Sequence, residues 1–200
     1  MPSQKKIRSR LQSLIGSGRI ADVRRRSRPS YTVDGFVLAV GRAWVLLAQV
    51  ESGGYPDGYA LLRLDDVTDV QPDSSFQSAF AATLPSWPRP LPPTNGALDL
   101  DSTRGMLDSV LRAGGLVGIE RDRRFDGLWI GVPHRLTKRW LWLTEVDHRA
   151  EWHDAPNGYR LATITTVVFG DRYQTALAAM AGQAPTTSVD DDRRSSRAEE

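Results

Sequence analysis

The chain has 200 residues, of which 40% are hydrophobic and 25% are charged, a composition typical of a folded globular protein. It contains no cysteine, which excludes disulfides, thiol catalysis and thiolate metal sites. The sequence shows neither an apolar run long enough to span a membrane nor the apolar core of a secretory signal, so we expect a cytoplasmic protein.

The net charge of +2 conceals an uneven distribution of charge along the chain. Residues 1–30 carry nine Lys or Arg and a single acid, Asp22, whereas residues 31–184 carry 14 basic and 18 acidic side chains. We therefore expect a mildly acidic folded body and a strongly basic N-terminal arm. A basic block of this kind indicates a charged partner rather than a particular fold.

The first predicted element is a helix over residues 3–14. Its apolar residues follow the i, i+4, i+7, i+8 spacing of one helix face: Ile7, Leu11, Leu14 and Ile15. A second helix of the same kind is predicted after Ser102, whose hydroxyl can cap it, and Gly114-Gly115 ends it. Two further helices are predicted after Asp73 and Asp171. Their aromatic-then-apolar pairs at i, i+4, Phe76 with Phe80 and Tyr173 with Leu177, are expected to plug their own barrel or the neighbouring one.

Short strands separated by turn signals follow each of the two leading helices. We expect them at residues 19–25, 35–40, 44–51, 59–64 and 67–71, and again at 116–121, 128–132, 140–147, 159–161 and 164–169. Tight turns are predicted at Gly41-Arg42, Asp57-Gly58 and Asn157-Gly158. Because five short strands cannot cover a core as a flat sheet, each set is expected to curl into a small barrel without free edges.

The two halves resemble each other in sequence. Asp34-Gly35 matches Asp126-Gly127, Trp44 matches Trp140, and Tyr59 matches Tyr159, with insertions in the second copy. A repeat of this kind predicts that both halves form the same five-stranded unit.

The order of a leading helix, five short strands and a glycine entering the second strand resembles the Sm-like small-barrel superfamily and, more loosely, SH3-like barrels. The resemblance covers about residues 3–84 and 102–181 and uses Gly35 with Gly127, or with Gly131 if the gap is placed differently. It implies a mainly β fold with flanking helices (α+β), a tandem repeat of two five-stranded small barrels. The aspartate and asparagine that shape a nucleotide pocket in Sm proteins are missing from residues 41–45 and 137–141, so the resemblance carries over the fold alone.

The domain boundaries follow from the composition. We expect a basic helix and first barrel with its closing helix at 1–84, a proline-rich linker at 85–101, a second barrel with flanking helices at 102–182 and a disordered tail at 183–200.

The basic arm is the strongest functional signal. Side chains that neutralise phosphates without reading sequence are expected to bind the RNA or DNA backbone: Lys5, Lys6, Arg8, Arg10, Arg24, Arg25, Arg26 and Arg28. The favoured function is thus a non-catalytic binding module for nucleic acid. The alternative is that the arm is merely solvated and the protein is an interaction scaffold without nucleic-acid binding, either as a homo-oligomer or with another protein.

The segment Trp140-Leu141-Trp142-Leu143 supports that alternative, because it is apolar on both faces of a predicted strand. One face is expected to line the barrel, and a helix, the other half or a second subunit must cover the other. As a core residue, Trp140 would cost about 3–5 kcal/mol when replaced by alanine.

Enzymatic function has little support in the sequence. No Ser-His-Asp arrangement, phosphate loop or cofactor motif is found, so we expect neither an enzyme nor a cofactor. Residues 145–154 gather two histidines and four acids, which makes His148 and His153 weak candidate metal ligands and a metal-dependent enzyme the third hypothesis. A solvated loop explains this segment better.

Overall fold

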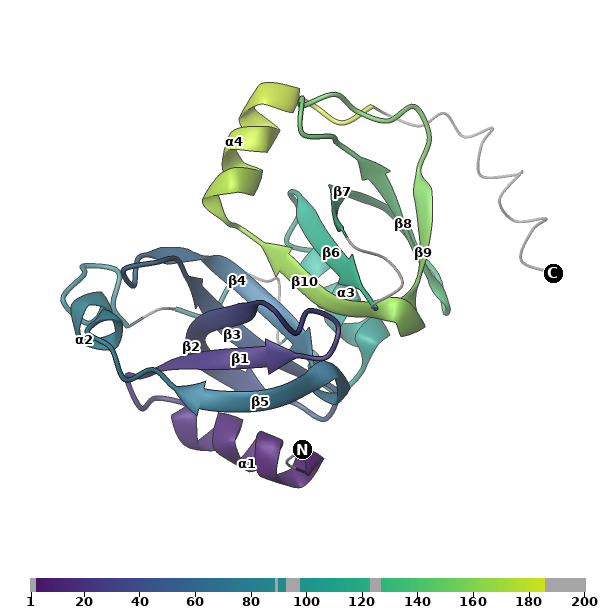
Figure 1. Ribbon diagram of the computed structural model, residues 1–200. Helices are drawn as coiled ribbons and strands as arrows, with labels where there is room; N and C mark the ends of the chain where they lie inside the picture. The colour runs from purple at the N-terminus through teal and green to yellow at the C-terminus, as the bar shows by residue number, and fades with distance from the viewer. Residues whose placement is uncertain (1–2, 89, 93–97, 123–126, 186–200) are drawn as a thin grey trace.

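The computed structural model describes residues 3–88, 90–92, 98–122 and 127–185. Within them the chain forms one antiparallel sheet of ten strands with four α-helices, a mixed α+β fold (Figure 1). The first half contains α1 (Gln4–Leu14), β1 (Ile20–Arg25), β2 (Thr32–Val40), β3 (Trp44–Val50), β4 (Pro56–Arg63), η1 (Leu64–Asp66), β5 (Val67–Pro72) and α2 (Gln77–Ala81). The second contains α3 (Thr103–Leu111), β6 (Val117–Arg121), β7 (Leu128–Leu136), β8 (Trp140–Glu145), β9 (Asn157–Arg160), η2 (Leu161–Thr163), β10 (Ile164–Phe169) and α4 (Arg172–Ala181).

The strand order is the same in the two halves. Across the sheet it runs β5-β1-β2-β3-β4 and then β10-β6-β7-β8-β9, so the fifth strand of each half lies beside its first. The expected pair of closed barrels is not formed, because β10 pairs with β4 of the other half rather than closing onto β9. The result is a single open sheet that runs through both halves, with β5 and β9 as its edges.

Both leading helices begin at the predicted serines. The Ser3 hydroxyl accepts a hydrogen bond from the backbone N–H of Lys6, and the Ser102 hydroxyl accepts one from Gly105. These bonds satisfy N–H groups that a helix leaves without a partner in its first turn. In α1 the predicted stripe is buried through Ile7, Leu11 and Leu14, whereas Ile15 is exposed.

Two of the predicted turns are wrong. Asp57-Gly58 lies inside β4 and Asn157-Gly158 begins β9. In the first half the reversal comes earlier, where Gly53 and Gly54 have φ of 89° and 86° and the N–H of Glu51 donates to the carbonyl of Tyr55 at 2.8 Å. The turn at Gly41-Arg42 is confirmed by the bond from Gly41 N to Trp44 O at 2.9 Å.

The strand register corrects the alignment of the halves. Trp44 pairs with Arg63 and Trp140 with Arg160, which makes the two tryptophans counterparts as predicted. Tyr59 pairs with Ala48, whereas Tyr159 pairs with Leu141, so the predicted match of these tyrosines is wrong. The two Gly-Tyr pairs look alike in sequence but occupy different positions along β4 and β9.

The counterpart of Gly35, the glycine in the second strand of the first half, is Gly131 rather than Gly127. Gly35 pairs with Gln49 and Gly131 pairs with Glu145, and these two partners each lie five residues after the tryptophan of their own half. A Cβ atom on Gly35 would lie 2.6 Å from the carbonyl oxygen of Ala48, and one on Gly131 would lie 2.3 Å from that of Thr144. Both glycines are therefore required for close approach of the neighbouring strand.

We expect Gly35→Ala and Gly131→Ala each to destabilise the protein by about 1–3 kcal/mol, because the obstructing atoms belong to the backbone and cannot rotate away. Gly114→Ala is a control for the loss of a glycine, since its Cβ would meet nothing within 4 Å, although its φ of 77° adds strain of about 1 kcal/mol. Thermal unfolding of the three variants measures the difference. Equal loss at all three positions would contradict the close-approach explanation.

The core has two main parts, one on each face of the first half. Val45 and Leu47 of β3 belong to a cluster with the apolar stripe of α1. Trp44, Leu46 and Ala48 face the other way and share a cluster with residues of the second half. The members from that half lie on α3, β6, β8, β9, η2 and β10: Met106, Leu107, Val110, Val117, Ile119, Leu141, Leu143, Tyr159, Leu161, Ile164, Val167 and Phe169.

The described part of the proline-rich linker packs on this second face. The Trp87 ring contacts Phe36 with centroids 4.5 Å apart, and the Tyr59 hydroxyl donates to the carbonyl of Pro90 at 3.2 Å. The linker therefore contributes to the core as well as joining the halves.

Both edges of the sheet oppose pairing with another chain. β9 is only four residues long. β5 ends at Pro72, which has no N–H, and the Arg10 guanidinium donates to the carbonyl of Val70 at 3.4 Å. Short strands, proline and charged side chains are common protections of sheet edges.

The predicted plugs are wrong at their first residues, because Phe76 and Tyr173 are exposed, whereas Leu177 of α4 is buried as predicted. In the described part of the chain, no helix combines the length and apolar character needed to cross a membrane. Most of the predicted disordered tail, residues 186–200, lies outside the described residues, as does Asp126.

Candidate functional site

The basic residues of α1 divide into two groups. Lys5 and Lys6 are exposed. Arg8 donates to the carbonyl of Arg42 at 2.5 Å, and Arg10 forms an ion pair with Asp69 at 3.2 Å. Two of these four predicted phosphate-binding residues thus already hold α1 against the sheet.

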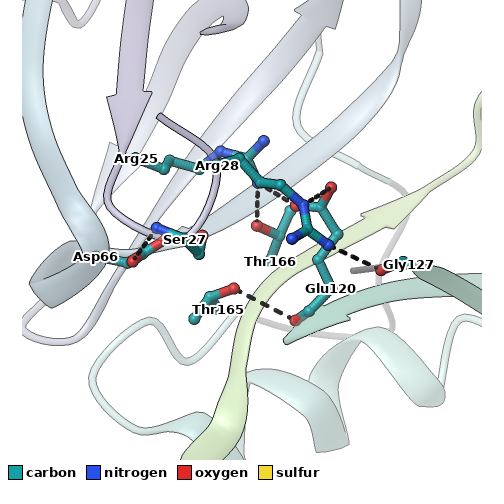
Figure 2. A network of polar contacts seen from close by, with 8 residues as sticks. All are labelled: Arg25, Ser27, Arg28, Asp66, Glu120, Gly127, Thr165 and Thr166. Atoms are coloured by element: carbon teal, nitrogen blue, oxygen red, sulfur yellow. Dashed lines mark hydrogen bonds and ion pairs between the residues drawn. The ribbon is translucent and has the colours of Figure 1, made fainter. Parts of the chain in front are cut away.

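Arg25 and Arg28 link the two halves (Figure 2). The Arg25 side chain is 4% exposed, and its guanidinium donates to the carboxylate of Glu120 and to the Thr166 hydroxyl. Arg28 lies 3.8 Å from the same carboxylate and donates to the carbonyl of Gly127 at 3.3 Å. These arginines form a polar connection between β1 and the strands β6 and β10, and are not part of an extended arm.

The chain just after β1 is anchored beside this network. The backbone N–H of Ser27 donates to Asp66 at 2.9 Å, and the Ser27 hydroxyl donates to the same carboxylate. Arg24 and Arg26, the remaining members of the predicted set, are exposed on either side of Arg25. The eight residues therefore do not act alike: Lys5, Lys6, Arg24 and Arg26 are exposed, whereas the other four make contacts that hold parts of the fold together.

The loop at 145–154 does not gather a metal site. His148 is exposed, and Nδ1 of His153 lies 3.8 Å from the buried carboxylate of Glu145. That carboxylate accepts a hydrogen bond from Tyr159, and burial together with Glu145 raises the pKa of the tyrosine. Over the described ranges, no group of three or more His, Asp or Glu is arranged to hold a metal ion.

Two carboxyl groups face each other across β1 and β2. Asp22 pairs with Asp34, and the pKa of each is raised above the ordinary value of 3.8, mainly by burial. For Asp22 the neighbouring Asp34 and Asp73 add to the shift. Opposed like charges on adjacent strands destabilise a sheet.

The contribution of this pair to stability should therefore fall as the pH rises above about 4, because the folded state holds these two protons more tightly than the unfolded state does. We expect Asp34→Asn to remove part of this dependence and to be more stable than the wild type at pH 7. Urea unfolding of both proteins at pH 3.5 and pH 7 measures it. A variant that is less stable than the wild type at both pH values would contradict this prediction.

Two tryptophans lie partly exposed on β8. Leu141 and Leu143 are buried in the core, whereas Trp140 and Trp142 point to the other face and are only half-buried, with ring centroids 6.3 Å apart. A hollow of about 360 Å³ opens beside Trp140. Its lining contains three cations and no acid among the described residues: Lys138, Arg139, Trp140, Arg160, Leu161 and Ala162.

The corresponding position in the first half, around Trp44, is covered by the chain. Trp44 is 0% exposed, and its indole N–H donates to the Thr103 hydroxyl at 3.2 Å. The backbone N–H groups of Ala43 and Trp44 donate to the carbonyl of Leu100 at 3.1 and 3.0 Å. Thus the segment that leads into α3 covers Trp44, and no described segment covers Trp140 in this way.

One feature is common to both tryptophans. The Arg63 guanidinium lies over the Trp44 ring at 5.0 Å, and that of Arg160 lies over Trp140 at 5.0 Å. Burial lowers the pKa of Arg63, which also donates to carbonyls of η2 and β10. Arg160 is exposed and lies beside the hollow.

We define the Trp140 surface as Trp140 and Trp142 with the rim formed by Lys138, Arg139 and Arg160. The alternation of Trp and Leu along β8 points to the two tryptophans from sequence alone. The rim does not show in the sequence, because Arg139 and Arg160 are separated by 21 residues and meet only when β9 pairs with β8. Comparison of the chain with protein-family models, with curated proteins and with solved structures gave no match in any of the three.

Proposed function

We propose that this chain is a non-catalytic protein-interaction module that binds its partner through the Trp140 surface. The observation that supports this proposal is the difference between the two halves. The outer face of β3 is covered by the chain itself, whereas the outer face of β8 leaves two tryptophans partly exposed. Large aromatic side chains surrounded by cations are typical of residues that dominate protein interfaces.

We also propose that each half is an Sm-like or SH3-like unit. The shared strand order supports this, as do the helix before the first strand and the short η1 and η2 between the fourth and fifth strands. In this proposal the pairing of β4 with β10 joins two such units into one sheet.

Photocrosslinking tests the interaction. A photoreactive amino acid placed at Trp142 in the full chain should form protein adducts in an extract of the source cells, and the adducts should survive nuclease treatment. Trp140→Ala should abolish them, because it removes the neighbouring ring of the surface. The control site is Tyr173, which is 55% exposed on α4. Adducts no stronger than those at Tyr173, or adducts lost on nuclease treatment, would refute the proposal.

A second candidate function is nucleic-acid binding, supported by the exposed Lys5, Lys6, Arg24 and Arg26 and by the basic rim beside Trp140. Because Arg25 and Arg28 are structural, the variant that tests it replaces only the four exposed residues by alanine. Binding to a single strand should weaken with salt, with a log–log slope of about −0.7 per phosphate neutralised. The variant should flatten this slope, and thermal unfolding of the variant checks that it is folded. Failure of the wild type to bind any oligonucleotide at low salt would exclude this function.

A further inference from the structure

The first half contains its own example of a segment bound over a tryptophan of this kind. Residues 98–102 form an irregular stretch that leads to α3, and together with Thr103, the first residue of α3, they reach Trp44; Leu100 is buried in the shared core. Asp101 accepts from the backbone N–H of Arg42 at 2.7 Å and forms an ion pair with its guanidinium at 3.1 Å. An acidic, leucine-containing segment is therefore what covers this position in the first half.

The Trp140 surface of the second half corresponds to the position around Trp44, but no described segment covers it. Backbone bonds fix the correspondence: Gly41 N donates to Trp44 O as Thr137 N does to Trp140 O, at 2.9 and 2.8 Å. Lys138 and Arg139 thus stand where the first half has Arg42 and Ala43. Compared with the first half, this position in the second half has one more cation and the same stacking of an arginine on the tryptophan.

The surroundings of Trp140 differ from those of Trp44 at Thr137. Its hydroxyl accepts from the N–H groups of Arg139 and Trp140 at 3.4 and 3.0 Å, as the carbonyl of Leu100 does for the N–H groups of Ala43 and Trp44. Its counterpart Gly41 has no side chain, and a Cβ there would lie 2.4 Å from Leu100. An occupant of the second half must therefore be held by its side chains rather than by a backbone carbonyl at this point.

We infer that the Trp140 surface takes an extended acidic segment of a partner protein, with a leucine-sized side chain on the tryptophans and carboxylates on Lys138, Arg139 and Arg160. This inference rests on the proposed function and specifies the partner's chemistry. Charge complementarity supports it, because the rim offers three cations and the covering segment of the first half carries Asp99 and Asp101.

The test uses a labelled synthetic peptide with the sequence of residues 98–103, Leu-Asp-Leu-Asp-Ser-Thr, titrated with the full chain. We expect binding that weakens with salt and that falls about tenfold in Trp140→Ala and in Arg160→Gln. Thr137→Gly should tighten binding by about tenfold, since it frees two N–H groups for the peptide carbonyl. Arg149→Gln, an exposed cation on the β8–β9 loop, should bind like the wild type.

Two control ligands separate the alternatives. A peptide with asparagine in place of both aspartates should bind at least about tenfold more weakly, and equal binding would overturn the acidic specificity. A single-stranded oligonucleotide that displaces the peptide and binds more tightly would assign the surface to nucleic acid and overturn the inference.

The two proposals fail in different ways. Absence of peptide binding by both the wild type and Thr137→Gly, with thermal unfolding showing that each is folded, would overturn the inference about the acidic segment. If nuclease-resistant adducts at Trp142 still form in that case, the interaction module stands with a partner of other chemistry. If the adducts are also absent, the proposed function fails as well.

Discussion

Replacing Trp44 by alanine is expected to destabilise the protein by about 3–5 kcal/mol, whereas Trp140→Ala should cost only about 1 kcal/mol. The two tryptophans occupy corresponding positions, but Trp44 is 0% exposed and donates a hydrogen bond to Thr103, while Trp140 is half-buried beside an open hollow. Removing Trp44 leaves a cavity between the halves and a hydroxyl without its donor. Urea unfolding of each variant measures the difference.

This expectation differs from the prediction made from the sequence alone, in which Trp140 is a core residue whose replacement by alanine costs about 3–5 kcal/mol. Leu46 offers a second comparison, because it occupies the position in β3 that corresponds to Trp142 in β8. Leu46→Ala should resemble Trp44→Ala, since Leu46 is 1% exposed. If Trp140→Ala proved as costly as Trp44→Ala, the Trp140 surface would be part of the core and unable to receive a partner.

The local structure could be predicted because its causes are local. The apolar spacing of Ile7, Leu11 and Leu14 and the capping serines Ser3 and Ser102 are sufficient to define α1 and α3. The ten strands follow from β-branched and aromatic runs between turn signals. The prediction of a turn at Asp57-Gly58 is wrong because a pair of glycines at 53–54 already reverses the chain.

The tertiary arrangement could not be read in the same way. Pairing of β4 with β10 joins residues about 100 positions apart, and no periodicity within either strand encodes it. The basic run Arg24-Arg25-Arg26 looks uniform in sequence, yet strand alternation turns Arg25 inward, where it finds Glu120 from the other half. Half of the candidate phosphate-binding set is therefore structural, and the sequence does not show this for Arg25 because its partner Glu120 lies 95 residues away in the chain.

Arg25→Ala is expected to destabilise the protein by about 3 kcal/mol, near the low end for breaking a buried ion pair. The loss leaves the Glu120 carboxylate at the junction of the halves with fewer donors, and the 19% exposure of that side chain limits the penalty. Replacing both partners, as Arg25→Met with Glu120→Leu, should cost at least about 1 kcal/mol less than the sum of the two single changes, because each single change leaves the other charge at the junction and the double change removes both. Arg28 loses its contact with Glu120 in the Glu120→Leu variant and in the double variant alike, so that loss cancels in the coupling.

Arg24→Ala is the matched control, since Arg24 is the neighbouring arginine on the exposed face of β1, and its replacement should change stability by less than about 0.5 kcal/mol. Urea unfolding of this variant, of Arg25→Met and Glu120→Leu alone and of the double replacement, all at one pH, gives the coupling energy directly. Additive losses for Arg25 and Glu120, or equal losses for Arg24 and Arg25, would contradict a buried connection between the halves. Coupling of the predicted size would instead show that Arg25 and Glu120 hold β1 to β6 at the junction of the two halves.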